Sequence, residues 1–345
     1  MTGIRGKRFI LPLGGILLLL LSPGRAAAGV REGLRLSGTL LIPALFPVSV
    51  LAGCLIRMGP ETGADHLLGG LTRRLLGLSG VCAVPLVLGQ LGGFPLGAQL
   101  TASLYRQGLI SREDALRLSA LSNQAGPAFL LGALGTILGG AAYGAALLLI
   151  QALSVLLCGQ LVRNPGRQTM AAAPMPRQNA CPGFWELLPQ ALGESAVSML
   201  RLTGAVSFFL ALRSCLRPLL EFLSLPGPAG VLLSGFLELS GGAAGLSGLR
   251  PQTALPAAAL LTGWGGLCVH LQAAEALFGA GLSLGPYLKI KLAQSGICLN
   301  LALLLETILG FTEPAALVPG LAVLPFFLLP AIFQKYPLKK AVSVV

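Results

Sequence analysis

Four short clusters in the sequence combine helix-breaking glycine or proline with side chains that can form hydrogen bonds. They lie at residues 89–100 (GQLGGFPLGAQL), 122–129 (SNQAGPAF), 235–245 (GFLELSGGAAG) and 263–272 (GWGGLCVHLQ), each inside a strongly apolar stretch. Amide side chains supply both donors and acceptors, and an imidazole can also exchange a proton near neutral pH. The chemistry that these residue types allow is reversible binding of a small polar solute or an ion.

The first half of the chain contributes two of these clusters. An interrupted helix frees backbone N–H and C=O groups, and its ends present partial charges that a polar solute or ion can use. The alternative is that the amide side chains only satisfy those freed backbone groups and bind nothing. The candidate binding residues here are Gln90, Gly93, Phe94, Pro95, Ser122, Asn123 and Gln124.

Glu238 is the strongest single candidate for a binding residue, because it is an ionisable residue within an apolar hairpin. Such a residue inside a membrane is a functional hypothesis by default. Its carboxyl group could bind a cation, carry a proton or contact a hydroxyl group of a solute. The alternative is a carboxyl group that only fixes the hairpin. Ser240 lies two residues further along and belongs to the same predicted site.

The fourth cluster adds three candidates with competing interpretations. His270, just after the glycine-rich break, is the nearest candidate for a titrating partner of Glu238, although a hydrogen-bonded core histidine is the favoured interpretation. Trp264 could stack on a ring of the solute, although a tryptophan between glycines more often fills space. Gln272 follows His270 by two positions, so the two side chains do not face one another closely on a helix.

Composition predicts a polytopic membrane protein whose main partner is the lipid bilayer. Hydrophobic residues make up 54% of the chain, charged residues 10%, and mean hydropathy is +0.81. Ordinary soluble domains carry about 25% charged residues. The net charge of +12 comes from basic residues that flank apolar spans, which is typical of cytoplasmic loops rather than of nucleic-acid binding.

Several classes of chemistry find no support in the sequence. The seven cysteines form no C-x-x-C pair, which argues against a disulfide framework or a zinc site. Residues 281–285 (GLSLG) match the G-x-S-x-G pattern of serine hydrolases, but no predicted strand precedes them. We therefore predict no enzymatic activity, no cofactor and no metal site.

The elements that position the clusters follow the same order twice: span, short hairpin, broken helix, span. In the first half we expect a span at 36–56, an interfacial helix at 65–77, a re-entrant hairpin at 81–105, a helix from 111 broken at 123–127, and a span at 141–161. In the second half we expect an amphipathic helix at 185–192, a span at 198–220, a hairpin at 230–246, a broken helix at 253–278 and a span at 287–309.

The ends of the chain add further expectations. Residues 9–21 form either a retained first helix, which we favour, or a signal peptide cleaved near residues 26–28. Residues 25–35 are expected to lie along the membrane surface as a helix. The resulting division is an N-terminal membrane helix (1–27), a first repeat (28–163), a cytoplasmic linker (164–184), a second repeat (185–310), and a C-terminal membrane helix with a basic tail (311–345).

The distribution of charge predicts a topology of about eight full spans with both termini in the cytoplasm. Most loop arginines, such as Arg57, Arg73 and Arg106, then lie inside together with Lys335. Arg201 and Arg213 are interpreted as snorkelling near the ends of one span, and Lys289 and Lys291 as cytoplasmic-end residues. The two hairpins would enter from opposite sides, so the repeats would be inverted.

Four motifs in order give the chain a recognisable resemblance: residues 43–47 (PALFP), 93–98 (GFPLGA), 123–129 (NQAGPAF) and 265–272 (GGLCVHLQ). Together they resemble the YlbJ-type sporulation integral membrane proteins, from about Ala28 to Leu309. That family belongs to the nucleoside-recognition (Gate) group, which is related to concentrative nucleoside transporters. Where those transporters carry an acidic residue in the first hairpin, this chain has Leu91, Gly92 and Gly93 after Gln90.

The resemblance implies a Gate-type inverted repeat in the cell membrane of an endospore-forming bacterium. Two functions are compatible with it. One is movement or binding of a small polar solute or ion, nucleoside-like by analogy with the family. The other is a non-transporting membrane scaffold for assembly of the spore envelope or cortex. A homo-oligomer is compatible with either function.

Overall fold

Every regular element in the described part of the chain is a helix. The computed structural model describes residues 3–58, 64–163, 183–222 and 227–309, and the predicted all-α class is confirmed over these ranges. Four helices, at Ala141–Leu161, Phe184–Leu219, Pro251–Phe278 and Leu284–Ile308, are long and apolar enough to cross a membrane. The number rises to six if each of two sharply bent helix pairs counts as one span.

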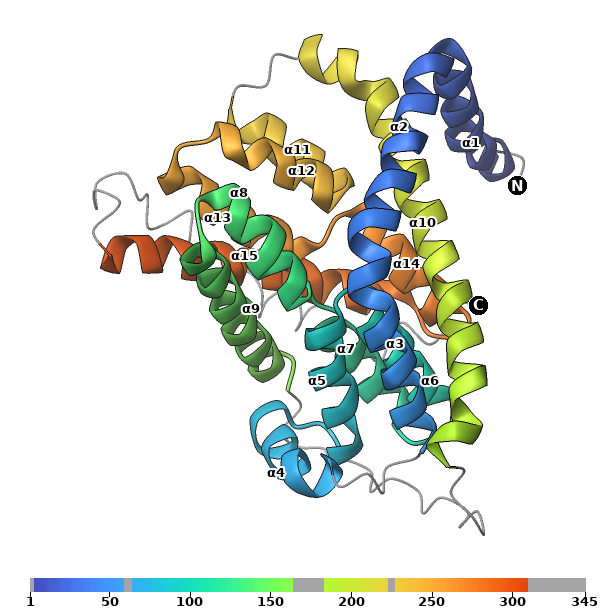
Figure 1. Cartoon of the computed structure of the whole chain (residues 1–345), viewed down its shortest axis with the longest axis vertical. Helices are drawn as coiled ribbons and strands as arrows, with labels where there is room; N and C mark the ends of the chain where they lie inside the picture. The colour runs from blue at the N-terminus through green and yellow to red at the C-terminus, as the bar shows by residue number, and fades with distance from the viewer. Residues whose placement is uncertain (1–2, 59–63, 164–182, 223–226, 310–345) are drawn as a thin grey trace.

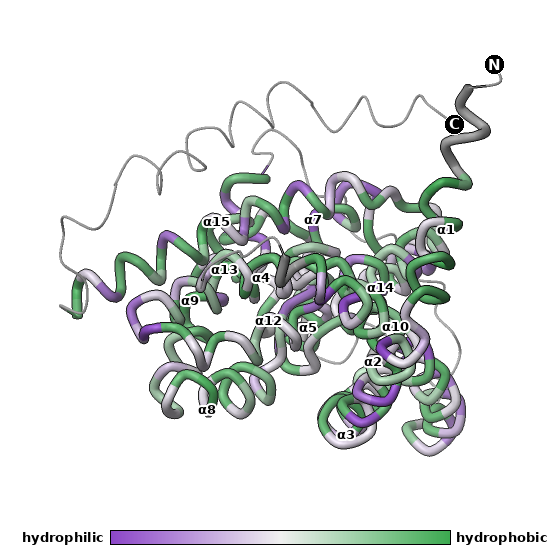
Figure 2. Tube along the Cα trace, turned by 90° about the horizontal axis from the view of Figure 1, so that it is seen from above, coloured by the Kyte–Doolittle hydropathy of each residue, from purple (hydrophilic) through white to green (hydrophobic). Residues whose placement is uncertain are grey.

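The helices expose apolar side chains of the kind that lipid covers. Phe9, Leu11, Leu21 and Leu200 are all more than two-thirds exposed, and Figure 2 shows hydrophobic colouring along most of the helical trace. The chain is therefore a multi-pass membrane protein. The expected eight spans are not reached within the described residues, and the predicted C-terminal span lies outside them.

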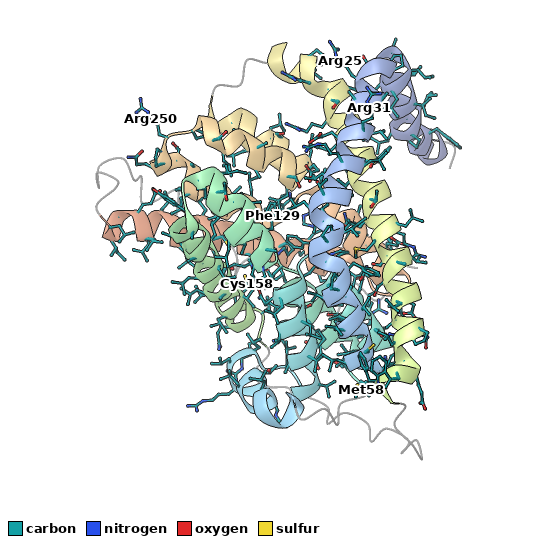
Figure 3. All side chains as sticks on the ribbon, viewed as in Figure 1. Arg25, Arg31, Met58, Phe129, Cys158 and Arg250 are labelled. Carbon is teal, nitrogen blue, oxygen red and sulfur yellow. The ribbon has the colours of Figure 1, made fainter. Side chains whose placement is uncertain are left out.

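One side of the molecule is a column of long helices (Figure 1). Helix α1 (Gly3–Leu21) precedes α2 (Pro23–Leu36), which continues through a π-helical turn (Ser37–Leu41) into α3 (Ile42–Arg57). The combined α2–α3 rod lies alongside α10 (Phe184–Phe222), with Arg25 and Arg31 at one end and Met58 at the other (Figure 3).

Close contact between α2 and α10 corrects the prediction of a surface helix at residues 25–35. A Cβ atom added to Gly33 would lie 2.4 Å from Ser207 Cα, and one on Gly29 would lie 2.4 Å from the Leu210 carbonyl oxygen. Two glycines one helical turn apart thus let the backbones approach, as small residues do in membrane helix pairs. The prediction of two separate helices at 185–192 and 198–220 is also wrong, because α10 runs through both.

The first hairpin and broken helix form as predicted. Helix α4 (Ala64–Leu76) leads to the hairpin of α5 (Ala83–Gly92) and α6 (Leu96–Arg106). Helix α7 (Arg112–Ser122) begins at its predicted cap, where Ser111 Oγ accepts a hydrogen bond from the Asp114 N–H at 3.1 Å. After the break the chain resumes as a π-helical segment (Ala128–Leu134) with α8 (Gly135–Leu138), followed by α9 (Ala141–Leu161).

The second half repeats this order. Helices α11 (Pro228–Leu237) and α12 (Leu239–Gly245) form a hairpin whose turn is at Glu238. Helices α13 (Pro251–Trp264) and α14 (Leu267–Phe278) are the two arms of a broken helix, and α15 (Leu284–Ile308) completes the described chain. The predicted positions of both breaks are confirmed.

The two halves share one core rather than forming separate bodies. Helix α14 packs on α6, α13 on α9, and α15 on both α7 and α9. Leu118 and Leu121 of α7 belong to the same apolar cluster as Tyr287 and Ile290 of α15. The predicted linker (164–184) and C-terminal segment (311–345) lie outside the described residues, apart from Gly183 and Phe184.

Replacement of Gly33 by alanine tests the α2–α10 contact. The new methyl group meets backbone atoms of Ser207 that cannot move aside, so we expect Gly33→Ala to lower stability by about 1–3 kcal/mol. Gly24→Ala in the same helix is the control, since nothing lies within 4 Å of its added Cβ. Thermal unfolding in detergent measures both variants. Equal melting temperatures for the two would contradict the contact.

Candidate functional site

The two hairpin turns and the two helix breaks meet at one place. A Cβ added to Gly93 would lie 3.0 Å from the Gly126 nitrogen, which joins the first hairpin to the first break. A Cβ on Gly265 would lie 3.2 Å from the Phe94 ring, and one on Gly266 would lie 3.1 Å from the Leu239 nitrogen. The second break therefore touches both hairpins, and the four clusters come together as the sequence predicts.

Positive backbone φ angles explain glycine at these contacts. Gly93, Gly265 and Gly266 have φ values of 77°, 93° and 89°, a region that other residues rarely adopt. The peptide bond between Phe94 and Pro95 is cis, and Pro95 is the N-cap residue of α6. These residues shape the turns, so backbone atoms rather than long side chains form much of the junction.

The first hairpin holds the end of α7 between its two arms. Cβ atoms added to Gly89 and Gly97 would lie 2.1 and 2.2 Å from the Ser122 carbonyl oxygen. The Ser122 hydroxyl donates to the Leu118 carbonyl at 2.7 Å and lies 3.1 Å from the Thr101 hydroxyl. Ser122 thus closes the last turn of α7 and ties it to α6.

A network of buried amides satisfies the backbone freed by the first break. Gln151 of α9 accepts from the Ala125 N–H at 3.2 Å and donates to the Ala125 carbonyl at 2.9 Å. It also donates to Gln90 Oε1 at 3.1 Å. Gln124 and Gln294 exchange amide hydrogen bonds of 3.1 and 2.7 Å, so helices α9 and α15 complete the break in α7.

Lys291 lies at the centre of this network and corrects its interpretation as a cytoplasmic-end residue. Its side chain is fully buried, and its Nζ donates to the Asn123 carbonyl at 3.2 Å and to Gln294 Oε1 at 2.8 Å. The ammonium group also lies 5.4 Å from the centre of the Phe94 ring, a cation–π distance. Sequence reasoning missed Lys291, although polar Tyr287, Lys291 and Gln294 share one face of an otherwise apolar helix.

An aromatic chain extends the network towards the second break. Asn123 Nδ2 donates to the Tyr287 hydroxyl at 2.9 Å, and that hydroxyl lies 3.4 Å from His270 Nδ1. The His270 ring is edge-on to Trp264 at 4.1 Å, and Trp264 stacks on Phe236 at 4.7 Å. The geometry favours a core role for His270 and a space-filling role for Trp264. His270 Nε2 is buried without a partner among the described residues.

Glu238 shapes the second hairpin. It is 4% exposed, and its carboxylate accepts from the backbone N–H groups of Ser240 and Gly241 at 2.9 and 2.6 Å. This is an N-cap, placed where the helix dipole of α12 favours negative charge. Arg213 of α10 reaches the same hairpin through Ser234 Oγ at 2.6 Å, so its interpretation as a snorkelling residue is wrong.

A cavity of about 100 Å³ lies where the four clusters meet. Five predicted site residues line it: Gly93, Phe94, Glu238, Ser240 and Gln272. The walls are otherwise mostly apolar, with Leu41, Leu45, Leu202 and Val206 from the long-helix column. The remaining predicted residues, which are Gln90, Pro95, Ser122, Asn123, Gln124, Trp264 and His270, lie beside the cavity and do not line it.

A larger hollow of about 600 Å³ adjoins this cavity between α3, α6, α10 and α14. Gln272 lines both spaces and donates to Cys268 Sγ at 3.3 Å. Ion pairs cross the hollow between Arg57 and Glu194 and, at 2.8 Å, between Arg201 and Glu275. Arg201, predicted near the end of a span, lies instead near the middle of α10 (Phe184–Phe222). We refer to this hollow, lined by these four charged residues, Arg106 and Gln272 among others, as the vestibule.

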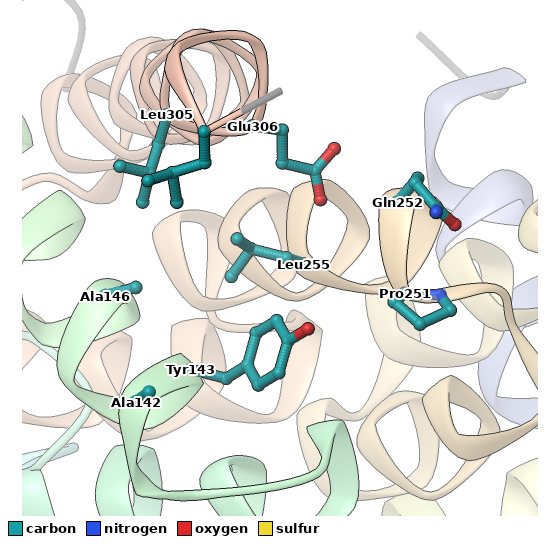
Figure 4. Close-up of a pocket in the computed structure, with 9 residues that line it drawn as sticks. Ala142, Tyr143, Ala146, Pro251, Gln252, Leu255, Leu305 and Glu306 are labelled. Carbon is teal, nitrogen blue, oxygen red and sulfur yellow. The ribbon is translucent and has the colours of Figure 1, made fainter. Parts of the chain in front are cut away.

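A third hollow, of about 340 Å³, lies away from the breaks, between α9, α13 and α15 (Figure 4). Tyr143, Gln252 and Glu306 line it, and Glu306 is 3% exposed. None of its lining residues belongs to the four clusters. Among the residues that the structure describes, no three His, Cys, Asp or Glu side chains gather closely enough to hold a metal ion.

Comparison with known proteins finds one informative similarity. The chain is 32% identical over 139 residues to the sporulation integral membrane protein YlbJ of Bacillus subtilis (strain 168). The match covers 40% of this chain and 34% of the relative, so it spans about a third of that protein's length. No family model and no solved structure matches the chain. The similarity supports a membrane protein of YlbJ-like type.

Replacement of Gln294 by leucine tests the buried network. The change leaves the Lys291 ammonium and the Gln124 amide without their closest partners, and we expect a loss of about 2–3 kcal/mol of stability. Gln272→Leu is the matched control, because that half-buried amide makes only a weak bond to sulfur. Thermal unfolding in detergent compares the two. A larger loss for Gln272→Leu would contradict the assigned network.

Proposed function

We propose that this chain is a sporulation-associated integral membrane protein whose Gate-type core binds and moves a small polar solute or ion. The observation that carries the proposal is the cavity at which two hairpins and two broken helices meet. Irregular backbone at membrane depth is tolerated only where it is buried in protein or lines a cavity. Paired interruptions in two halves of a chain are the usual construction of a transporter binding site.

The size and lining of the cavity indicate a small ligand. Its volume of about 100 Å³ is below the ~300–1,000 Å³ of sites that enclose drug-sized molecules. Glu238 and Ser240 give it a polar part, and Phe94 and Gly93 also line it. A nucleoside-like solute, expected by analogy with the Gate group, would require the hairpins to separate during binding.

The vestibule supplies an access route. It adjoins the cavity at Gln272, and Arg57 and Arg106 lie on its walls. Those arginines are cytoplasmic in the topology that the charge distribution predicts, with both termini inside. In the proposed inverted arrangement the vestibule opens to the cytoplasm, and movement of the hairpins past Gln272 exposes the cavity alternately to the two sides.

A scaffold function is the second candidate, and one observation favours it. Gln124 and Gln294 are fully buried, and their amides are bonded mainly to each other and to neighbouring protein groups. Such side chains form hydrogen bonds with the backbone groups that a broken helix leaves free, whether or not a ligand binds. A protein that retained this fold only to assemble the spore envelope would keep the network and would not need the cavity.

Uptake by reconstituted protein tests the first function. We expect proteoliposomes to accumulate one or more small polar solutes, with nucleosides assayed first. Glu238→Gln removes the charge from the cavity wall and should reduce uptake about tenfold or more, which corresponds to about 1.4 kcal/mol. Glu306→Gln is the control, since it changes a buried carboxyl in a different hollow. Equal uptake by all three proteins would remove Glu238 from the mechanism.

A variant that blocks the route between the vestibule and the cavity distinguishes the transport function from the scaffold function. Gln272→Trp places a large ring where the two spaces adjoin, and we expect it to abolish uptake with little change in melting temperature. The same variant, expressed in the native host in place of the wild type, should then fail to support sporulation. Normal spore yield from a variant that does not transport would favour the scaffold.

A further inference from the structure

The Lys291 ammonium is surrounded by oxygen atoms of the kind that bind a dissolved cation. Its Nζ lies 3.2 Å from the Asn123 carbonyl oxygen, 2.8 Å from Gln294 Oε1 and 3.5 Å from Gln124 Oε1. The Asn123 carbonyl belongs to the C-cap residue of α7, at the end where the helix dipole is negative. Unwound carbonyls and half-helix ends of this type coordinate sodium ions or protons in membrane transporters.

No carboxylate of the described residues lies within 4.0 Å of Lys291 Nζ, so an ion pair does not neutralise its charge. A lysine that only needed to be buried would normally be expected beside an acid. The charge here is instead compensated by neutral oxygens and by the face of Phe94 at 5.4 Å. A set of neutral dipoles around one positive charge matches the requirements of a monovalent cation.

One side-chain acceptor of Asn123 remains unused. Asn123 Oδ1 is buried and has no hydrogen-bond partner in the part of the chain that the structure describes, whereas the nitrogen of the same amide donates to Tyr287. The residue that offers its main-chain carbonyl to Lys291 thus also carries a buried side-chain acceptor that no group of the described residues uses.

We propose that Lys291 is a built-in cation that fills a monovalent-cation site at the junction of α7 and α15. The site is formed by oxygens of Asn123, Gln124 and Gln294, and it is separate from the cavity lined by Glu238. Because the lysine is covalently attached, its ammonium group compensates the partial negative charge of the oxygens at the break in α7. The protein then needs no dissolved alkali ion at this position. Loss of the ammonium group converts the position into a site for sodium or potassium.

Thermal unfolding of the full chain in detergent tests this inference without reference to transport. Melting temperatures are compared in NaCl, KCl and N-methylglucamine chloride at equal ionic strength. We expect the wild type to melt at the same temperature in all three salts. Lys291→Ala should melt lower in N-methylglucamine and should recover by about 3 °C or more in NaCl or KCl, as expected for a ligand that binds only the folded state.

Lys289→Ala is the matched control, because Lys289 is exposed on the same helix two residues earlier. It should respond to the three salts as the wild type does. A wild type stabilised by sodium or potassium would show that the ammonium does not occupy the site. A folded Lys291→Ala protein with one melting temperature in all three salts would show that the oxygens do not form a cation site.

A second variant tests the inference if Lys291→Ala does not fold. Gln294→Glu keeps the lysine and places a carboxylate where the amide oxygen now lies, 2.8 Å from Nζ. Glutamate and leucine at this position both lose the amide donor to Gln124, so Gln294→Leu is the reference. With a positive charge at Lys291, the new ion pair should make Gln294→Glu melt clearly higher than Gln294→Leu. A glutamate variant that melts no higher than the leucine variant would mean that the buried carboxylate has no cation beside it, and would overturn the inference.

Discussion

An apolar environment leaves no free hydrogen-bond partners, and this constraint explains most of the described structure. Each interruption of a helix releases peptide groups that lipid and hydrocarbon side chains cannot satisfy. The break in α7 is completed by Gln151 from α9 and by Lys291 and Gln294 from α15. The hairpin turn at Glu238 is completed by its own carboxylate. The polar residues of the core are therefore positioned first of all by broken backbone.

The need to bury interrupted backbone inside the protein also explains where the cavity lies. Glycines at the turns let backbone segments approach each other, as between Gly93 and Gly126. The cavity results from this geometry, with Glu238 on one wall and Phe94 on another. Phe94 belongs to both environments, since its ring lines the cavity and also faces the Lys291 ammonium.

Much of this arrangement follows from local sequence, and some of it does not. Glycine and proline clusters locate both hairpins and both breaks, and α9 runs over the predicted residues 141–161, because helix interruption is a local property. The partners of the breaks lie far away in the chain, as single amides in apolar helices. Gln151 gives no local signal of its role. Lys291 lies only two turns into α15, and a lysine so near a helix end resembles one that reaches the membrane surface.

Tertiary packing also overrides local signals elsewhere. Pro189 and Gly193 suggest a boundary, yet α10 continues through them because α2 and α3 pack along its length. Polar Arg31 and Arg35 suggest a surface position for α2. Its position is instead set by Gly29 and Gly33, which lie against the backbone of α10. The residue pattern of a single helix does not show which of its faces packs against a neighbouring helix.

The separation of hydrogen-bonded partners along the chain has a consequence for biosynthesis. Gln124 and Gln294 pair across 170 residues, so the first half leaves the ribosome long before its partner helix exists. Until α15 is inserted, the open end of α7 needs water or the insertion machinery as a temporary partner. The lateral release of the early helices into lipid must therefore wait for the last described one, and the nascent chain matures as a unit rather than half by half.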